Sequence, residues 1–284
     1  MSISPGLGVQ RRVDVAAGSI AYRECGTGTP IVFVHGVAVN GDLWRGVVPK
    51  LAERFRCITP DLPWGSHSIP LKPDSDLSLP GMARIVADFL EALDLERVVI
   101  VANDTGGAVA QALVGRHPER ISRLVLTSCD AFEKFPPTPQ KYLVLMARSR
   151  MLTWMVAYTA KFKLIQRLPT AYGYVTSRPM PTDIMRSYTG PVRLNAGVRC
   201  DFRRMLRAVD TKYTFDAADR LGTFDKPALV LWAEDDKIFP REHGQRLAEL
   251  LPRGEFALMH DSRTFIPEEQ PQPLATAIED FLSR

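Results

Sequence analysis

The feature that most constrains this chain is the alternation of short apolar segments with stretches of helical periodicity. A first strand is predicted at "GSIAYRECG", and the apolar segments then run through "TPIVFVHG", "FRCITPDLP", "ERVVIVAN", "ISRLVLTSC", "KPALVLWAEDD" and "EFALMH". Continuous apolar strands of this kind are buried on both faces, which is typical of a parallel sheet between two layers of helices. The expected fold class is therefore α/β, with a mostly parallel central sheet and helices on both faces.

The alternation stops at Asp130 and resumes near residue 216. Between them lie a Pro-rich loop, "KFPPTPQ", and helix-like segments without clear strands. We predict a core formed by residues 1–130 and 216–284, and a helical lid formed by residues 131–215. Ligands of open parallel sheets bind beyond the carboxyl ends of the strands, so the lid is expected to cover the site.

The predicted lid differs from the core in charge. Residues 131–215 contain 15 Lys and Arg against 4 Asp and Glu, whereas the whole chain has a net charge of only +4. Two interpretations stay open, a solvated helical surface or a basic lid that attracts an anionic substrate or partner. The stripe "LVLMARSRMLTWMVAY" predicts a lid helix whose apolar side packs inward or lines a pocket.

Composition excludes several classes of protein. The chain of 284 residues is 45% hydrophobic with a mean hydropathy of −0.07, and no apolar run approaches the ~20 residues of a membrane span. Its four cysteines form no CxxC pair, and no phosphate loop or G-x-G-x-x-G is present. We predict a cytoplasmic monomer or homodimer that binds a small molecule, with no metal, cofactor, nucleic-acid or membrane partner.

One strand ends in a sharp, Gly-containing turn that opens a helix. This turn reads Asn103-Asp104-Thr105-Gly106-Gly107. Small residues there allow strand and helix to approach closely, and the positive end of the helix favours an ionised carboxylate. Asp104 is therefore a candidate catalytic carboxylate, with a simple helix N-cap as the alternative.

Together these segments resemble the α/β-hydrolase superfamily over nearly the whole chain. The motifs "VFVHG", "PDLPWGS", the turn at Asp104, "RHPERISRLVL", "LVLWAEDDKIFP" and "PEEQPQPLATAIEDFL" occur in the family's order. The resemblance implies an α/β-hydrolase fold with the lid inserted after the sixth strand. An Asp at the nucleophile position resembles haloalkane dehalogenases, fluoroacetate dehalogenases and epoxide hydrolases, in which a carboxylate forms an ester that water hydrolyses.

The resemblance also implies roles for other residues. The backbone amides of Val37 and Thr105 correspond to the oxyanion hole. Asp236 stands at the usual place of the catalytic acid, and Asp130 stands at a place that some dehalogenases use instead. Epoxide hydrolases protonate the opening oxygen with lid tyrosines, of which the insertion has Tyr142, Tyr158, Tyr172, Tyr174, Tyr188 and Tyr213.

The chain departs from the family at the catalytic histidine. Thr264 stands where that His is expected, and threonine cannot act as a general base at neutral pH. His260, four residues earlier, is the candidate for a displaced base, with a strand-end role as the alternative. His35 belongs to the family's His-Gly turn, where it is usually structural. Loss of a general base typically costs 10² to 10⁴ in rate.

Three functions follow from these residues. The first is hydrolysis of a small, largely apolar molecule through an ester on Asp104. The second is a lyase, isomerase or cyclase in which Asp104 is an acid or base and no water is activated. The third is a ligand-binding relative without turnover.

Overall fold

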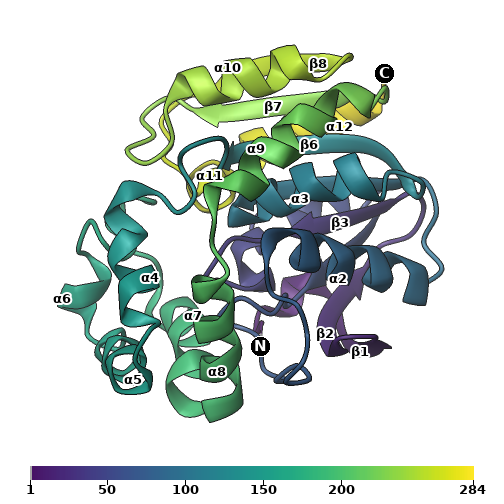
Figure 1. The fold of residues 1–284 in the computed structure, drawn as a ribbon. Coiled ribbons are helices and arrows are strands. Elements are labelled where there is room, and N and C mark those ends of the chain that lie inside the picture. Colours follow the sequence, from purple (N-terminus) through teal and green to yellow (C-terminus); the bar gives the residue numbers. More distant parts are fainter. Residues whose placement is uncertain (1) are drawn as a thin grey trace.

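The computed structural model describes residues 2–284, which form one eight-stranded sheet with helices on its faces (Figure 1). The strand order is β1-β2-β4-β3-β5-β6-β7-β8, with β2 antiparallel to β1 and β4 and all other pairs parallel. The strands are β1 (Val9–Val15), β2 (Gly18–Cys25), β3 (Pro30–Val34), β4 (Arg56–Pro60), β5 (Val98–Asp104), β6 (Ile121–Cys129), β7 (Ala228–Ala233) and β8 (Gly254–Met259). The predicted α/β class and α/β-hydrolase architecture are confirmed.

Helices cover the sheet as the apolar patterns predict. The core helices and short 3-10 turns are η1 (Pro5–Leu7), η2 (Gly41–Trp44), α1 (Val48–Leu51), α2 (Leu79–Ala92), α3 (Thr105–Arg116), α9 (Thr211–Arg220), η4 (Leu221–Thr223), α10 (Arg241–Leu250), α11 (Ile266–Glu269) and α12 (Pro271–Leu282). Helices α2, α3 and α9 pack beside one another in front of the sheet in Figure 1, with α12 behind it. Every residue of β5 and β7 is buried between these layers.

The sequence missed one strand, β1. Most of its residues are exposed, and it lies at the sheet edge paired only with β2. Such a strand lacks the continuous apolar run that marks the buried strands. With β1 included, the helical insertion follows the sixth strand along the chain.

The insertion contains η3 (Thr138–Gln140), α4 (Lys141–Met146), α5 (Arg150–Thr159), α6 (Lys163–Gln166), α7 (Thr182–Leu194) and α8 (Ala196–Arg207). These helices stand apart from the sheet layers (Figure 1). Helix α9 instead packs on α3, so the boundary expected at residue 215 falls inside a core helix. Within residues 2–284, no helix combines the length and apolarity needed to cross a membrane.

Candidate active site

Asp104 lies at the junction of β5 and α3. Its φ is +56°, a left-handed conformation that is uncommon for a residue other than glycine. Gly106 makes this turn possible, because a Cβ there would collide with the main-chain oxygens of Val34 and His35. The Asp104 side chain accepts no N-cap hydrogen bond from the helix amides beyond Thr105, so the N-cap alternative is not borne out.

Two backbone amides hold the Asp104 carboxylate. They belong to Val37 and Thr105, the two residues expected to form the oxyanion hole. Burial raises the pKa of Asp104 to about 7, and the charge of Asp236 adds to the shift. The amide hydrogen bonds act in the opposite direction, because they stabilise the ionised form. The pKa of Asp104 therefore lies well above that of an ordinary aspartate.

Asp130 is the second carboxyl at this end of the sheet. It is fully buried, and its Oδ2 accepts a hydrogen bond of 2.8 Å from the Thr105 hydroxyl. Its Oδ1 is buried without a hydrogen-bond partner, although Asp130 lines the cavity described below. Burial raises the pKa of Asp130 well above its usual range, and the charge of Asp104 adds to the shift. We therefore expect Asp130 to be neutral when Asp104 is ionised.

Asp236 is bound to Thr264. Its Oδ1 accepts hydrogen bonds from the Thr264 hydroxyl at 2.9 Å and from the amides of Ile238 and Phe239 at 2.8 and 2.9 Å. Thr264 is fully buried, and the Asn103 side-chain amide donates to its carbonyl oxygen over 2.7 Å. Asp236 thus occupies the place expected of a catalytic acid, but its partner is a hydroxyl that cannot take a proton at neutral pH.

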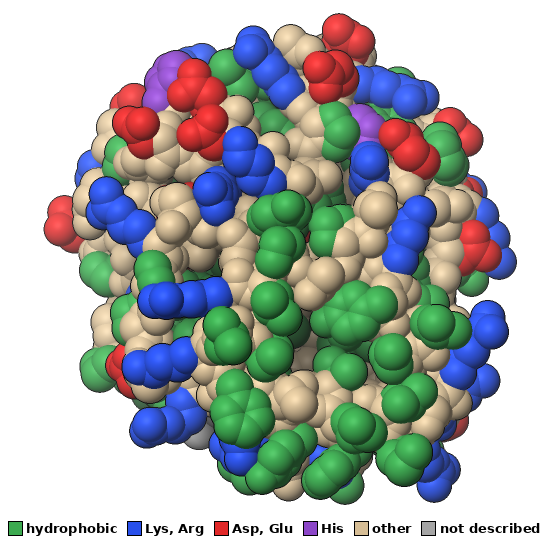
Figure 2. Space-filling model, turned by 90° about the vertical axis from the view of Figure 1, so that its left-hand side faces the viewer, with side chains coloured by type: hydrophobic (Ala, Val, Ile, Leu, Met, Phe, Trp, Pro, Cys, Tyr) green, Lys and Arg blue, Asp and Glu red, His purple; other side chains and the backbone are tan. Residues whose placement is uncertain are grey.

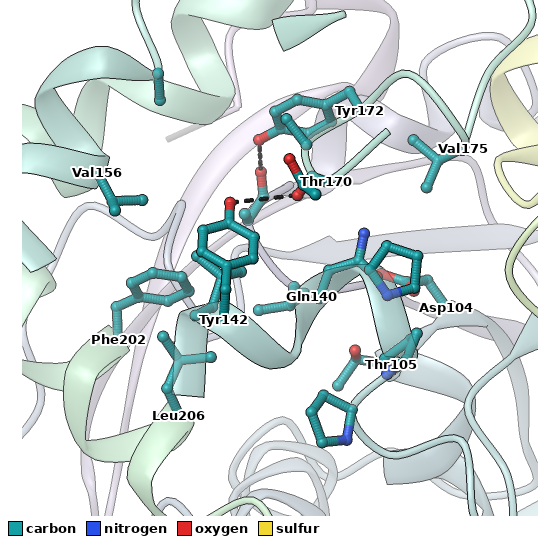
Figure 3. Close-up of a pocket in the computed structure, with 18 of the residues that line it drawn as sticks. Asp104, Thr105, Gln140, Tyr142, Val156, Thr170, Tyr172, Val175, Phe202 and Leu206 are labelled. Carbon is teal, nitrogen blue, oxygen red and sulfur yellow. Dashed lines mark hydrogen bonds between the residues drawn. The ribbon is translucent and has the colours of Figure 1, made fainter. Parts of the chain in front are cut away.

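A cavity of about 610 Å³ lies between these carboxyls and the lid (Figure 3). Asp104, Thr105 and Asp130 line its floor, and lid helices α4 to α8 with the loops between them supply most of the other lining residues. Most of the lining is apolar; Figure 3 shows Val156, Phe202 and Leu206 among these side chains. The cavity therefore suits a small, largely apolar molecule.

Three of the six lid tyrosines line the cavity: Tyr142, Tyr172 and Tyr188. The Tyr172 hydroxyl donates to the carbonyl oxygen of Ala38 at 2.7 Å, and the Tyr142 hydroxyl donates to that of Thr170 at 3.3 Å (Figure 3). The Tyr188 hydroxyl is buried without a partner. Burial raises the pKa of all three hydroxyls, so each stays protonated.

The alpha/beta hydrolase fold family has a sequence model that matches residues 29–271. The chain belongs to this family. It is 27% identical to a cis-3-alkyl-4-alkyloxetan-2-one decarboxylase of Xanthomonas campestris, over 96% of each chain. It is 26% identical to haloalkane dehalogenase 2 of Mycobacterium tuberculosis, over 94% of this chain and 93% of the relative. A crystal structure of an alpha/beta hydrolase fold protein from Burkholderia ambifaria matches with a TM-score of 0.77 and 25% identity, over 96% and 100% of the two chains.

In this α/β-hydrolase-fold protein the histidine expected as a displaced base lies elsewhere. The His260 side chain is 73% exposed and pairs with Glu234 at 3.1 Å. Strand β8 ends at Met259, and the chain then turns at Asp261 with a φ of +52°. The proposal that His260 serves Asp104 is wrong, because its side chain stands at the surface.

His35 does not supply a base either. Its Nδ1 lies 2.8 Å from the Gly36 carbonyl oxygen, and its Nε2 accepts from the Leu62 amide at 2.8 Å. Burial lowers its pKa to about 3, so the ring is neutral and structural. All five histidines lie within the described chain, and none of them lines the cavity.

Two features of the site had no clear signal in the sequence. The link between the Thr105 hydroxyl and Asp130 joins residues 25 positions apart. The Asn103 side chain also ties the turn to Thr264 and to the carbonyl of Thr127. A polar Asn inside an otherwise apolar strand was the available hint. Residues 2–284 contain no group of three or more His, Cys, Asp or Glu side chains that could hold a metal ion.

Proposed function

We propose that this protein is an enzyme that uses Asp104 as an acid and base on a small, largely apolar substrate, in a reaction that consumes no water. The observation that carries the proposal is the hydrogen bond from Thr264 to Asp236. It fills the place where the family's histidine is expected to activate water. An ester on Asp104 would have no base to hydrolyse it.

The protonation of Asp104 supports proton transfer. A group that both gives and takes protons works best when its pKa lies near the working pH. Burial raises the pKa of Asp104 to about 7, so both forms are populated at neutral pH. A carboxylate that served only as a nucleophile would gain nothing from a raised pKa, because only its ionised form attacks.

Asp130 supplies a second polar group in an otherwise apolar cavity. Because its Oδ1 has no protein partner, a substrate oxygen can accept a hydrogen bond from the neutral acid. Thr105 connects the two carboxyls, since its amide binds Asp104 and its hydroxyl binds Asp130. We propose that Asp104 carries the transferred proton and that Asp130 orients and polarises the substrate.

The Xanthomonas relative suggests the first substrate class to test. Its name describes loss of carbon dioxide from a four-membered lactone with two alkyl groups. In such a reaction the ring C–O bond breaks, the carboxyl group leaves as CO2 and the two alkyl-bearing carbons become an alkene. A protonated Asp104 can donate to the ring oxygen as it leaves and regain the proton as CO2 departs.

The test is product analysis with a cis-3,4-dialkyl-oxetan-2-one. We expect alkene formation by the wild type and a loss of 10² to 10⁴ in kcat/KM for Asp104→Asn. The matched control is Asp74→Asn, because Asp74 is an exposed loop carboxylate. Formation of the β-hydroxy acid over many turnovers would show hydrolysis and contradict the proposal. Accumulation of one equivalent of covalent adduct would instead show that Asp104 attacks the substrate and that the resulting ester is not hydrolysed.

A further inference from the structure

The outer surface of the lid is unusually apolar for a protein surface. Thirteen large hydrophobic side chains are exposed among residues 2–284, and nine of them lie within residues 145–174. These nine are Leu145, Met151, Trp154, Met155, Tyr158, Phe162, Leu164, Leu168 and Tyr174. We call residues 145–174 the outer lid surface. Clusters of exposed apolar side chains mark surfaces that bind a membrane or another protein.

Helix α5 turns its apolar stripe outward. Met151, Trp154, Met155 and Tyr158 follow the helical spacing i, i+3, i+4 and i+7, and all four are exposed. The opposite side of α5 carries Ala157, which is buried and lines the cavity. The expectation that this stretch packs inward or lines a pocket therefore holds for Leu143, Val156 and Ala157, which line the cavity, and is wrong for the large side chains that α5 exposes. The helix covers the cavity with small side chains and presents its large ones to the outside.

Charge around this surface has a single sign. Residues 134–182 contain eight Lys and Arg and no Asp or Glu. Seven of the eight are exposed: Lys141, Arg148, Arg150, Lys161, Lys163, Arg167 and Arg178. Figure 2 shows hydrophobic side chains gathered over this face around a hollow, with basic side chains beside them and acidic ones mainly at its margins.

We propose that the outer lid surface docks on an anionic lipid bilayer, with the cavity beneath it receiving apolar substrate from the membrane. An amphipathic surface with Trp, Tyr and Phe on its apolar side and Lys and Arg around it is suited to the headgroup region. Trp154 and Tyr158 stack at 5.3 Å, and the Lys161 ammonium lies 3.9 Å from the Tyr158 ring centre. Lys161 thus keeps its charge beside rings that can enter the interface.

A second copy of this chain fits the same surface poorly. A two-fold symmetric dimer would place the patch on itself and bring the two sets of basic side chains together. With no acidic residue in 134–182, nothing within the patch would offset that repulsion. Anionic lipid supplies the opposite charge and the apolar phase together. Docking of this kind replaces the sequence-based prediction of no membrane partner. It differs from a membrane span, which the helices of residues 2–284 do not provide.

The experiment uses vesicles of phosphatidylglycerol and phosphatidylcholine in equal parts, compared with phosphatidylcholine alone. We expect the whole protein to float with the anionic vesicles and to be released as NaCl rises from ~0.1 M to ~0.5 M. Trp154 gives a direct readout, because it is the exposed one of the chain's four tryptophans while Trp44, Trp64 and Trp232 are fully buried. Its emission should shift to the blue on docking and become protected from acrylamide.

Two variants test the two components of the surface. The triple reversal Lys161→Glu, Lys163→Glu, Arg167→Glu should lower partition at least about 100-fold, since each basic residue contributes about fivefold. Its matched control is Arg12→Glu, Lys212→Glu, Arg253→Glu, which reverses three exposed charges outside the outer lid surface. Trp154→Glu should also weaken binding, whereas Trp154→Phe should bind and lose only the fluorescence change.

Several results would overturn the docking proposal. These are failure to float with either vesicle, equal loss of partition in both charge-reversal triples, or a concentration-dependent dimer that Trp154→Glu dissociates. Asp104→Asn should bind vesicles like the wild type. Docking therefore stands or falls separately from the proposed chemistry.

Discussion

The sheet end buries polar side chains, whereas the lid exposes apolar ones. At the sheet end, Asp104, Asp130 and Asp236 are buried beside one another, and burial raises the pKa of each. Within residues 2–284, no Lys or Arg forms an ion pair with any of the three. On the outer lid surface, large apolar side chains and basic groups are exposed together. Both arrangements oppose stability, since buried charges and exposed apolar groups are unfavourable. The difference matches the two proposals, in which the sheet end carries out the chemistry and the lid gives the substrate access.

The largest expected effect is on stability, where a substitution at the sheet end should cost far more than one in the lid. Gly106→Ala places a Cβ against the main-chain oxygens of Val34 and His35, so we expect a loss of about 3 kcal/mol. The matched change is Gly190→Ala in lid helix α7, where no atom lies within 4 Å of the new Cβ. That change should be neutral or stabilise by up to about 1 kcal/mol. Thermal unfolding of both variants measures the difference in stability, and equal melting temperatures would contradict the prediction.

Asp130→Asn should have the next largest effect. Asn keeps the size of the side chain and an oxygen to accept from Thr105, but it removes the acidic proton. We expect kcat to fall about tenfold or more while the fold is retained. Steady-state kinetics with Asp74→Asn as control provides the measurement. Unchanged kcat would reduce Asp130 to a buried structural group.

The pH dependence of stability tests the buried acid directly. Between about pH 4 and pH 7 the folded protein keeps a proton on Asp104 that the unfolded chain has lost. The free energy of unfolding therefore falls as pH rises through this range and stays low above it. Asp104→Asn should remove this part of the slope between pH 5 and pH 8.

His35 contributes the opposite slope, because burial lowers its pKa and protonation below about pH 6.5 disfavours the folded state. The comparison with Asp104→Asn at each pH cancels this contribution. If the melting temperatures of the wild type and of Asp104→Asn change with pH in the same way from pH 5 to pH 8, a raised pKa for Asp104 is excluded.

Tyr142→Phe should have the smallest effect. Its hydroxyl is already bonded to the Thr170 carbonyl, and its ring forms part of the lid wall. We expect less than a threefold change in kcat/KM, because the lid shapes the cavity and the carboxyls do the chemistry. A hundredfold loss would show that a lid hydroxyl takes part in the reaction, so that the chemistry would not be confined to the sheet end.

The sequence predicted the parts of the molecule that depend on local pattern. Continuous apolar strands, the Gly-containing turn and the order of motifs led to the α/β-hydrolase fold and to Asp104. The Thr105 amide belongs to this turn, and the Val37 amide belongs to the His-Gly turn after β3. They could be placed because these turns position them whatever the side chains are.

The direction in which side chains point could not be predicted from the sequence. The position of His260 depends on where β8 ends and how the chain turns at Asp261, and neither has a sharp pattern. The stripe on α5 has helical spacing, but spacing does not reveal whether the stripe faces the core or the outside. The partner of Thr105 depends on how β5 and β6 pair across a register shift next to Asp104.

The central claim is that Asp104 acts without an ester that water must open, and oxygen labelling tests it most directly. The protein is allowed many turnovers in H2¹⁸O, and the mass of the peptide that contains Asp104 is then measured. Our account predicts an unlabelled carboxyl, because no water attacks an Asp104 ester. Incorporation of ¹⁸O into Asp104 would contradict it and would show that water opens an ester intermediate on Asp104.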